Sequence, residues 1–180
     1  MRKVFDGRRL DVKAFADEGA QLGGHDAMAA HSRLMAETQG RAPDSMITWS
    51  ARGELRNPGH VSPELWLHLQ AAAALSLVCQ RCLAPVEVPV TVDRAFRFVP
   101  DEQTAAAQDD QSEEDLLALS SAFDLLELIE DELLMELPVA PRHDVCPVPV
   151  PMTAADPQFE QQAEPAEHPF ALLRKLTTRS

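Results

Sequence analysis

Residues 64–98 read ELWLHLQAAAALSLVCQRCLAPVEVPVTVDRAFRF, and this stretch decides the fold. Its second half has apolar side chains in one alternating phase, at Val86, Val88, Val90, Val92, Phe96 and Phe98. A period of two predicts a strand with one buried face. Pro89 lies within this strand and has no N–H to donate, so it marks a sheet edge or a bulge.

The first half, residues 64–78, is ambiguous between a strand and a helix. Odd-numbered positions from 65 to 77 are all apolar, which favours a strand. The alanines at 71–74 and an opening at Ser62-Pro63-Glu64 would also suit a helix. The alternation is the longer pattern, so we favour the strand. A third strand is predicted around Ile47, Trp49 and Ala51, and the turn signal Asn57-Pro58-Gly59 follows it, which together indicate an antiparallel meander.

Helices are predicted on both sides of these strands. Asp11 can cap a helix that runs to Glu18, and a second helix is predicted from His25 or Asp26 to Gln39. A third begins after Asp124, with Glu127 in the capping-box position, and ends at Pro138. Its apolar stripe consists of Leu126, Ile129, Leu133 and Leu137. The predicted fold class is therefore α+β, an antiparallel sheet with N-terminal helices and one acidic amphipathic helix packed on it.

The negative charge is concentrated in one block. The chain has 16 basic and 29 acidic residues, a formal charge of −13. Residues 98–141 contain no Lys or Arg and hold 13 of the acids, so the remainder is neutral, with 16 acids and 16 bases. This excludes a broad basic surface for nucleic acid. We interpret the block as a solvated acidic face or as a surface that attracts basic partners, and residues 101–114 as a mobile acidic loop.

The same composition predicts one domain over residues 1–146. Residues 147–180 are rich in proline and predict a largely flexible tail with a short basic end. No apolar run reaches the roughly 18–20 residues of a membrane span, and the N-terminal residues lack the apolar core of a secretory signal. Three cysteines make a disulfide framework improbable, so a cytoplasmic protein with reduced thiols is expected.

The strongest local signal is Cys79-Gln80-Arg81-Cys82, at the turn between two strands, with a distant counterpart in His143-Asp144-Val145-Cys146. Zinc prefers four thiolate or imidazole ligands, and two intervening residues let both sulfurs of a pair reach one ion. Cys79, Cys82, His143 and Cys146 are therefore candidate Zn²⁺ ligands. The alternative is that these are ordinary reduced thiols in or near the core.

Catalytic alternatives are weaker. A thiol oxidoreductase using Cys79 and Cys82 would need a helix after the pair to lower a thiol pKa, and here a valine-rich strand follows. A metal-dependent nuclease built on Glu130, Asp131 and Glu132 would need all three carboxylates to bind the same ion. Adjacent side chains on a helix point in different directions, so these three cannot converge on one ion. No phosphate-binding glycine loop or nucleophile elbow is present.

Several segments together resemble the YceD family, the large ribosomal RNA subunit accumulation proteins. They are Cys79–Cys82 with the valine-rich strand, Ile129-Glu-Asp-Glu-Leu-Leu-Met-Glu-Leu-Pro138 and Pro141-Arg-His-Asp-Val-Cys146, with looser likeness near the start and at Pro169-Phe170-Ala171. The motif falls on Cys79, Arg81, Cys82, Glu130, Asp131, Glu132, Pro138, Pro141, His143 and Cys146.

The resemblance implies a cytoplasmic bacterial protein needed for synthesis, processing or accumulation of 23S ribosomal RNA, with no established catalytic activity. Its partners would be ribosome-assembly proteins or pre-ribosomal large-subunit RNA, with no membrane and no small-molecule substrate. His168 replaces the usual Asn before Pro-Phe, and Ser120-Ser121-Ala122 replaces a glycine-bearing turn.

Overall fold

The computed structural model describes residues 4–149. The chain divides into two units, Met1–Cys146 and Pro147–Ser180. The first unit is described below, and the predicted character of the tail concerns mainly residues outside the described part. Among the described residues, no helix combines the length and apolar character needed to cross a bilayer.

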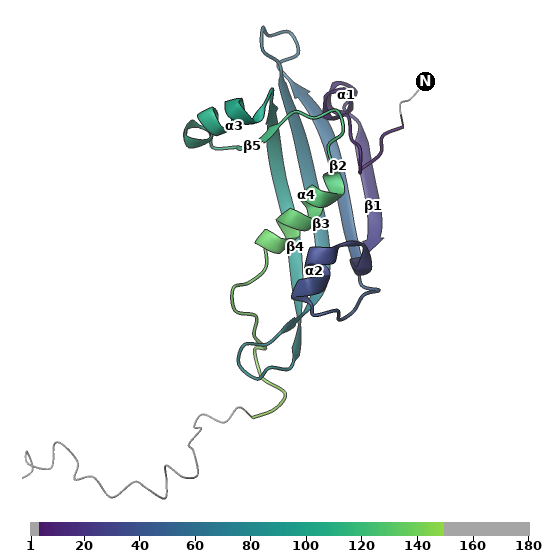
Figure 1. Ribbon diagram of the computed structural model, residues 1–180, viewed down its shortest axis with the longest axis vertical. Coiled ribbons are helices and arrows are strands. Elements are labelled where there is room, and N and C mark those ends of the chain that lie inside the picture. Colours follow the sequence, from purple (N-terminus) through teal and green to yellow (C-terminus); the bar gives the residue numbers. More distant parts are fainter. Residues whose placement is uncertain (1–3, 150–180) are drawn as a thin grey trace, which may run out of the picture. The chain divides into compact units, whose positions relative to one another are not determined.

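Five strands form one sheet in the order β1-β2-β3-β4-β5 (Figure 1). They are β1 Gln21–Ala27, β2 Met46–Arg56, β3 Glu64–Val78, β4 Pro85–Val99 and β5 Asp115–Ala118. The first four pair antiparallel, which confirms the predicted meander and the strand at 64–78. The short β5 runs parallel to the end of β4, so the sheet is mixed. The predicted α+β class is confirmed.

Pro89 lies opposite Ala74 in an uninterrupted register, so β4 has no bulge at this point. On its other side, within residues 4–149, β4 pairs with β5 only at Phe96–Val99. Pro89 therefore lies on an edge, which is the first of the two predicted alternatives.

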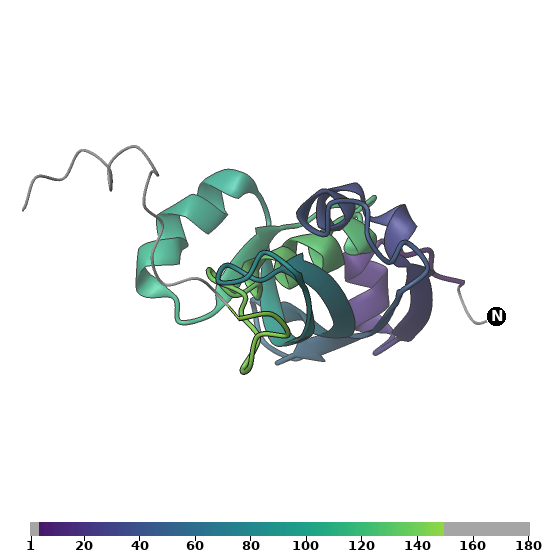
Figure 2. The same cartoon turned by 90° about the horizontal axis from the view of Figure 1, so that it is seen from below.

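Helices α1 Val12–Asp17, α2 Ser32–Glu37 and α4 Leu125–Met135 cover one face of the sheet (Figures 1 and 2). The alternating strand residues bury one face against them, as in β2, where Ile47, Trp49 and Ala51 are buried and Thr48 and Ser50 are exposed. The core between the layers includes Phe15, Leu34, Ile47, Leu67, Leu75, Ile129 and Leu133.

Caps fix two of these helices where the sequence predicts them. The Asp11 carboxylate accepts a hydrogen bond from the Ala14 amide, and Gly19 with a φ of +56° follows the end of α1. Asp124 accepts from the amides of Leu126 and Glu127 at the start of α4. Side-chain oxygens at these positions satisfy N–H groups that have no partner inside the helix.

The predicted helix from His25 to Gln39 is wrong in its first part. Residues 21–27 form β1, a short 3₁₀ helix covers Met28–Ala30, and only Ser32–Glu37 is α-helical. Backbone pairing with β2 overrides the helical spacing of the apolar residues. The absence of a side chain at Gly24 permits this pairing, because a Cβ at that position would lie only 2.7 Å from the Trp49 ring.

The predicted acidic loop at 101–114 is also wrong in part. It contains α3 Glu102–Gln108 and a 3₁₀ turn, Asp109–Gln111. Asp101 caps α3 by accepting from the Thr104 amide, and three alanines at 105–107 favour the helix. The low apolar content of the segment concealed a capped helix.

Gly53 provides a test of the contact between α1 and the sheet. A Cβ at this position would lie 2.5 Å from the Phe15 carbonyl oxygen, whereas a Cβ at Gly59 would meet nothing within 4 Å. We expect Gly53→Ala to lower the free energy of unfolding by about 1–3 kcal/mol in urea denaturation, because the backbone of α1 must move. The control Gly59→Ala should stay within about 0.5 kcal/mol of wild type. Equal effects of the two substitutions would contradict this packing.

Candidate metal centre

The C-x-x-C pair lies at the tip of the β3–β4 hairpin. The Cys79 amide donates to the Ala84 carbonyl over 2.9 Å, and the Leu83 amide donates to the Cys79 carbonyl over 2.9 Å. Leu83 adopts a φ of +62°, which turns the chain back toward β4. This tight turn presents both thiols on one side of the tip.

The second pair arrives on residues 138–146, which we name the return segment because it brings the chain back from α4 to the hairpin. The Gln80 amide donates to the Pro141 carbonyl over 2.8 Å. The Arg81 guanidinium donates to the carbonyls of His143 and Asp144 over 2.7 and 3.2 Å, and its Nε lies 3.1 Å from Cys146 Sγ. Arg81 and Pro141, two predicted motif residues, therefore hold the return segment against the hairpin.

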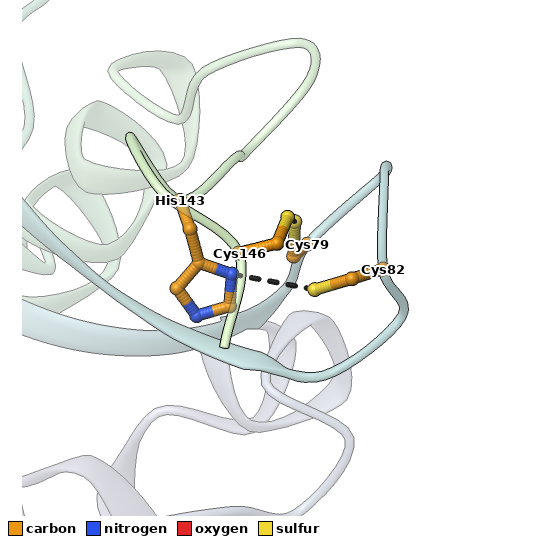
Figure 3. A group of neighbouring side chains, drawn as sticks. All are labelled: Cys79, Cys82, His143 and Cys146. Atoms are coloured by element: carbon orange, nitrogen blue, oxygen red, sulfur yellow. Dashed lines mark hydrogen bonds between the residues drawn. The ribbon is translucent and has the colours of Figure 1, made fainter. Parts of the chain in front are cut away.

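The structure brings the four predicted ligands together (Figure 3). One potential ligand atom from each of Cys79, Cys82, His143 and Cys146 lies within 4.8 Å of all the others. The sulfurs of Cys79 and Cys146 are 4.0 Å apart, and Cys82 Sγ lies 3.4 Å from His143 Nδ1. All three cysteines are free thiols. This group could hold a metal ion.

The orientation of His143 suits a ligand role. Its Nε2 lies 2.9 Å from the Pro85 carbonyl oxygen, which can only accept a hydrogen bond. The proton is therefore on Nε2, and Nδ1 turns its lone pair toward the sulfurs (Figure 3). Such a backbone contact fixes the tautomer of metal-binding histidines.

The pKa values of Cys79 and Cys82 are shifted in opposite directions. Burial of Cys79 opposes ionisation, but backbone N–H groups of Cys82, His143 and Arg81 surround its sulfur and bring the pKa to about 5. A backbone N–H from Ala84 favours the Cys82 thiolate, yet burial and the neighbouring sulfurs outweigh it, and the pKa of Cys82 is raised. A site with one thiolate already stabilised and others crowded beside it favours neutralisation by a cation.

The carboxylates of α4 lie in a different environment. Glu130 is buried and accepts from the backbone amides of Arg33 and Leu34 over 2.7 and 3.1 Å, at the first turn of α2. Asp131 pairs with the Arg33 guanidinium. These two residues dock α2 against α4.

Glu132 points toward the sheet instead. Its carboxylate lies 3.5 Å from Arg94 Nε on β4, and Arg94 also pairs with Asp115 on β5. Burial raises the pKa of Glu132. Glu130 and Asp131 therefore share Arg33, whereas Glu132 faces Arg94, so the three carboxylates do not converge on one point, as predicted. None of them belongs to the Cys/His group found among residues 4–149.

The remaining motif residue, Pro138, follows the end of α4 and lines a hollow of about 550 Å³ with Arg81 and Pro141. Sequence reasoning did not identify Arg33 and Arg94 as partners of the acidic motif. Both are isolated bases with no local pattern, and only the tertiary fold brings them to α4.

We expect substitutions of Glu130 and Glu132 to change the free energy of unfolding in opposite directions. Glu130→Ala leaves the backbone amides of Arg33 and Leu34 without their acceptor, removes one of the two carboxylates that pair with the Arg33 guanidinium, and should cost about 3 kcal/mol of unfolding free energy. Glu132→Gln should stabilise the fold at neutral pH by up to about 1 kcal/mol, because the buried carboxylate is costly when ionised.

The stability gain expected for Glu132→Gln should depend on pH. Because the folded-state pKa of Glu132 is raised, its protonated form favours folding, and that contribution is lost as the pH rises from about 4.5 through the folded pKa. The advantage of Glu132→Gln should therefore shrink as the pH falls through the folded pKa toward about 4.5, and it should change little below that pH. Urea denaturation at several pH values measures both effects, and a gain independent of pH would contradict the assignment.

Comparison with known proteins agrees with this set of residues. The family model described as large ribosomal RNA subunit accumulation protein YceD matches residues 67–177. The match includes the C-x-x-C hairpin, the acidic motif on α4 and the return segment. No solved structure matches the chain significantly. Because the match covers more than half of the chain, the protein belongs to the YceD family of large ribosomal RNA subunit accumulation proteins.

Proposed function

We propose that this protein is a non-enzymatic ribosome-biogenesis factor that supports the synthesis, processing or accumulation of 23S ribosomal RNA in the cytoplasm. The family name supports a role in large-subunit RNA accumulation. The observation that carries the finer proposal is that the family's Cys/His residues gather at a junction between two segments. Such a junction serves to fix a scaffold.

We further propose that Cys79, Cys82, His143 and Cys146 bind one Zn²⁺ as a structural staple. A set of three thiolates and one imidazole is typical of closed structural zinc sites. Bound zinc would leave a net charge of −1 on the ligand set, and the Arg81 guanidinium beside Cys146 compensates it. The ion would hold the return segment to the hairpin and add its binding free energy to folding.

The alternative of a thiol oxidoreductase has one observation in its favour, the low pKa of Cys79. The same thiol is fully buried, with 0% of its surface exposed, and a redox nucleophile requires access to its substrate. We therefore prefer the structural role.

The charge of the molecule favours protein partners. Each neutralised phosphate of RNA requires a cation, and the stretch 98–141 offers none. We propose that the protein acts mainly through ribosome-assembly proteins, so that its effect on ribosomal RNA is mediated by them.

The zinc proposal is tested by metal analysis of untagged protein. We expect one equivalent of zinc in wild type and its loss in Cys82→Ser and His143→Ala. The control His25→Ala changes an exposed histidine that contacts Thr48, and it should retain the metal. Removing zinc with a chelator should lower the unfolding free energy by about 3 kcal/mol, the value for a ligand at about 100 times its Kd. Metal-free wild type from a zinc-replete preparation would refute the site.

The cellular proposal is tested by deletion of the gene. We expect the ratio of 23S to 16S ribosomal RNA to fall and to be restored by the wild-type chain. Cys82→Ser should restore it only in part, because the return segment is no longer fixed. An unchanged ratio in the deletion strain would count against the proposed role.

A further inference from the structure

Two adjoining hollows lie on the acidic side of the molecule, between α3, β5 and α4. Their volumes are about 450 and 360 Å³, and they share Leu117, Ser120 and Phe123 as lining residues. Figure 1 shows the position, where β5 and the chain after it run between α3 and α4. We name this pair of hollows the acidic groove.

The floor of the acidic groove is apolar. Leu117, Leu119 and Phe123 are half-buried, so part of each side chain stays accessible. The Phe123 ring packs edge-on against Phe98 with 5.3 Å between ring centroids, and its backbone exchanges hydrogen bonds with Leu10. The floor is therefore a fixed surface built on the core.

The rim of the groove is negative. The carboxylates that line it are Asp101, Glu102, Asp124, Glu127 and Asp131, and none of the lining residues is Lys, Arg or His. Asp101 and Asp124 cap helices, and Asp131 pairs with Arg33. Within residues 4–149, Glu102 and Glu127 have no cationic partner in hydrogen-bond contact.

We infer that the acidic groove binds an extended segment of a partner protein in which Lys or Arg side chains flank an apolar anchor. The apolar floor would accept the anchor, and the rim would pair with the cations. Phosphate groups would be repelled by the same carboxylates, so the charge favours a basic protein segment over RNA. The inference deepens the proposed function, because a ribosome-assembly protein rich in basic residues has this chemistry.

Binding is tested with a short synthetic peptide in which lysines flank a central Leu-Phe pair. Titrated into the nitrogen-15-labelled full chain at low ionic strength, it should shift the amide resonances of Leu119, Ser120 and Ala122 in a saturable manner. A peptide with the same lysines and Gly-Ser in place of Leu-Phe should bind at least about threefold more weakly, since buried apolar side chains supply part of the affinity.

Matched variants separate the groove from overall charge. The double substitution Glu102→Gln/Glu127→Gln should weaken binding about three- to tenfold, whereas Glu18→Gln/Glu37→Gln, an equal change at exposed acids outside the lining of the groove, should change it less than about twofold. Ala122→Arg places a cation at an exposed position of the lining and should abolish binding without loss of core packing. Absence of peptide binding to wild type, or equal losses in both double variants, would overturn the inference.

Two further outcomes distinguish this inference from the proposed function. Ala122→Arg should fail to restore the 23S ratio in the deletion strain. If it restores the ratio fully, the groove is not used and the role in ribosomal RNA accumulation stands. A single-stranded RNA probe that shifts the same amides, and binds more tightly to the Glu102→Gln/Glu127→Gln variant, would refute a protein segment as the occupant.

Discussion

Continuous pairing of β3 with β4, from Leu65 opposite Phe98 to Val78 opposite Pro85, is the constraint on which the rest of the structure depends. It aligns the buried faces of the two longest strands, so one layer of short helices is enough to close the core. It also ends in a tight turn that carries two thiols. The position of the Cys/His group is therefore a consequence of the sheet register.

Electrostatic contacts then assemble the remaining elements around this hairpin. Glu130 holds α2, Glu132 and Asp115 converge on Arg94, and Arg81 holds the return segment. Consecutive acidic residues on α4 thereby reach two different neighbours, because Glu130 and Asp131 bind α2 and Glu132 faces Arg94 on β4. A helix presents successive side chains about 100° apart, so a run of charges can connect several layers at once.

Much of this architecture could be predicted from local patterns. The alternation of apolar residues identified β2, β3 and β4, and capping residues located α1 and α4. The spacing of potential metal ligands paired two short motifs whose residues are 61 or more positions apart in the sequence. Strand β1 was not predicted because its Gly23-Gly24 pair interrupts any alternation of apolar and polar side chains. The segment is a strand because its backbone pairs with β2. The parallel strand β5 has only four residues, too few to show a period. The partners Arg33 and Arg94 are defined by tertiary contacts alone, which local patterns do not encode.

The edge formed by Pro89 has a consequence for self-association. Over residues 85–95, β4 has a strand neighbour on one side only within the described part of the chain. The return segment contacts this side at Pro85, and an edge without a paired strand is a template for adding a strand from another molecule. An incoming strand would meet a position without a donor at the centre of that edge. Pro89 therefore disfavours the addition of a strand from another molecule, and it does so without interrupting the register between β3 and β4.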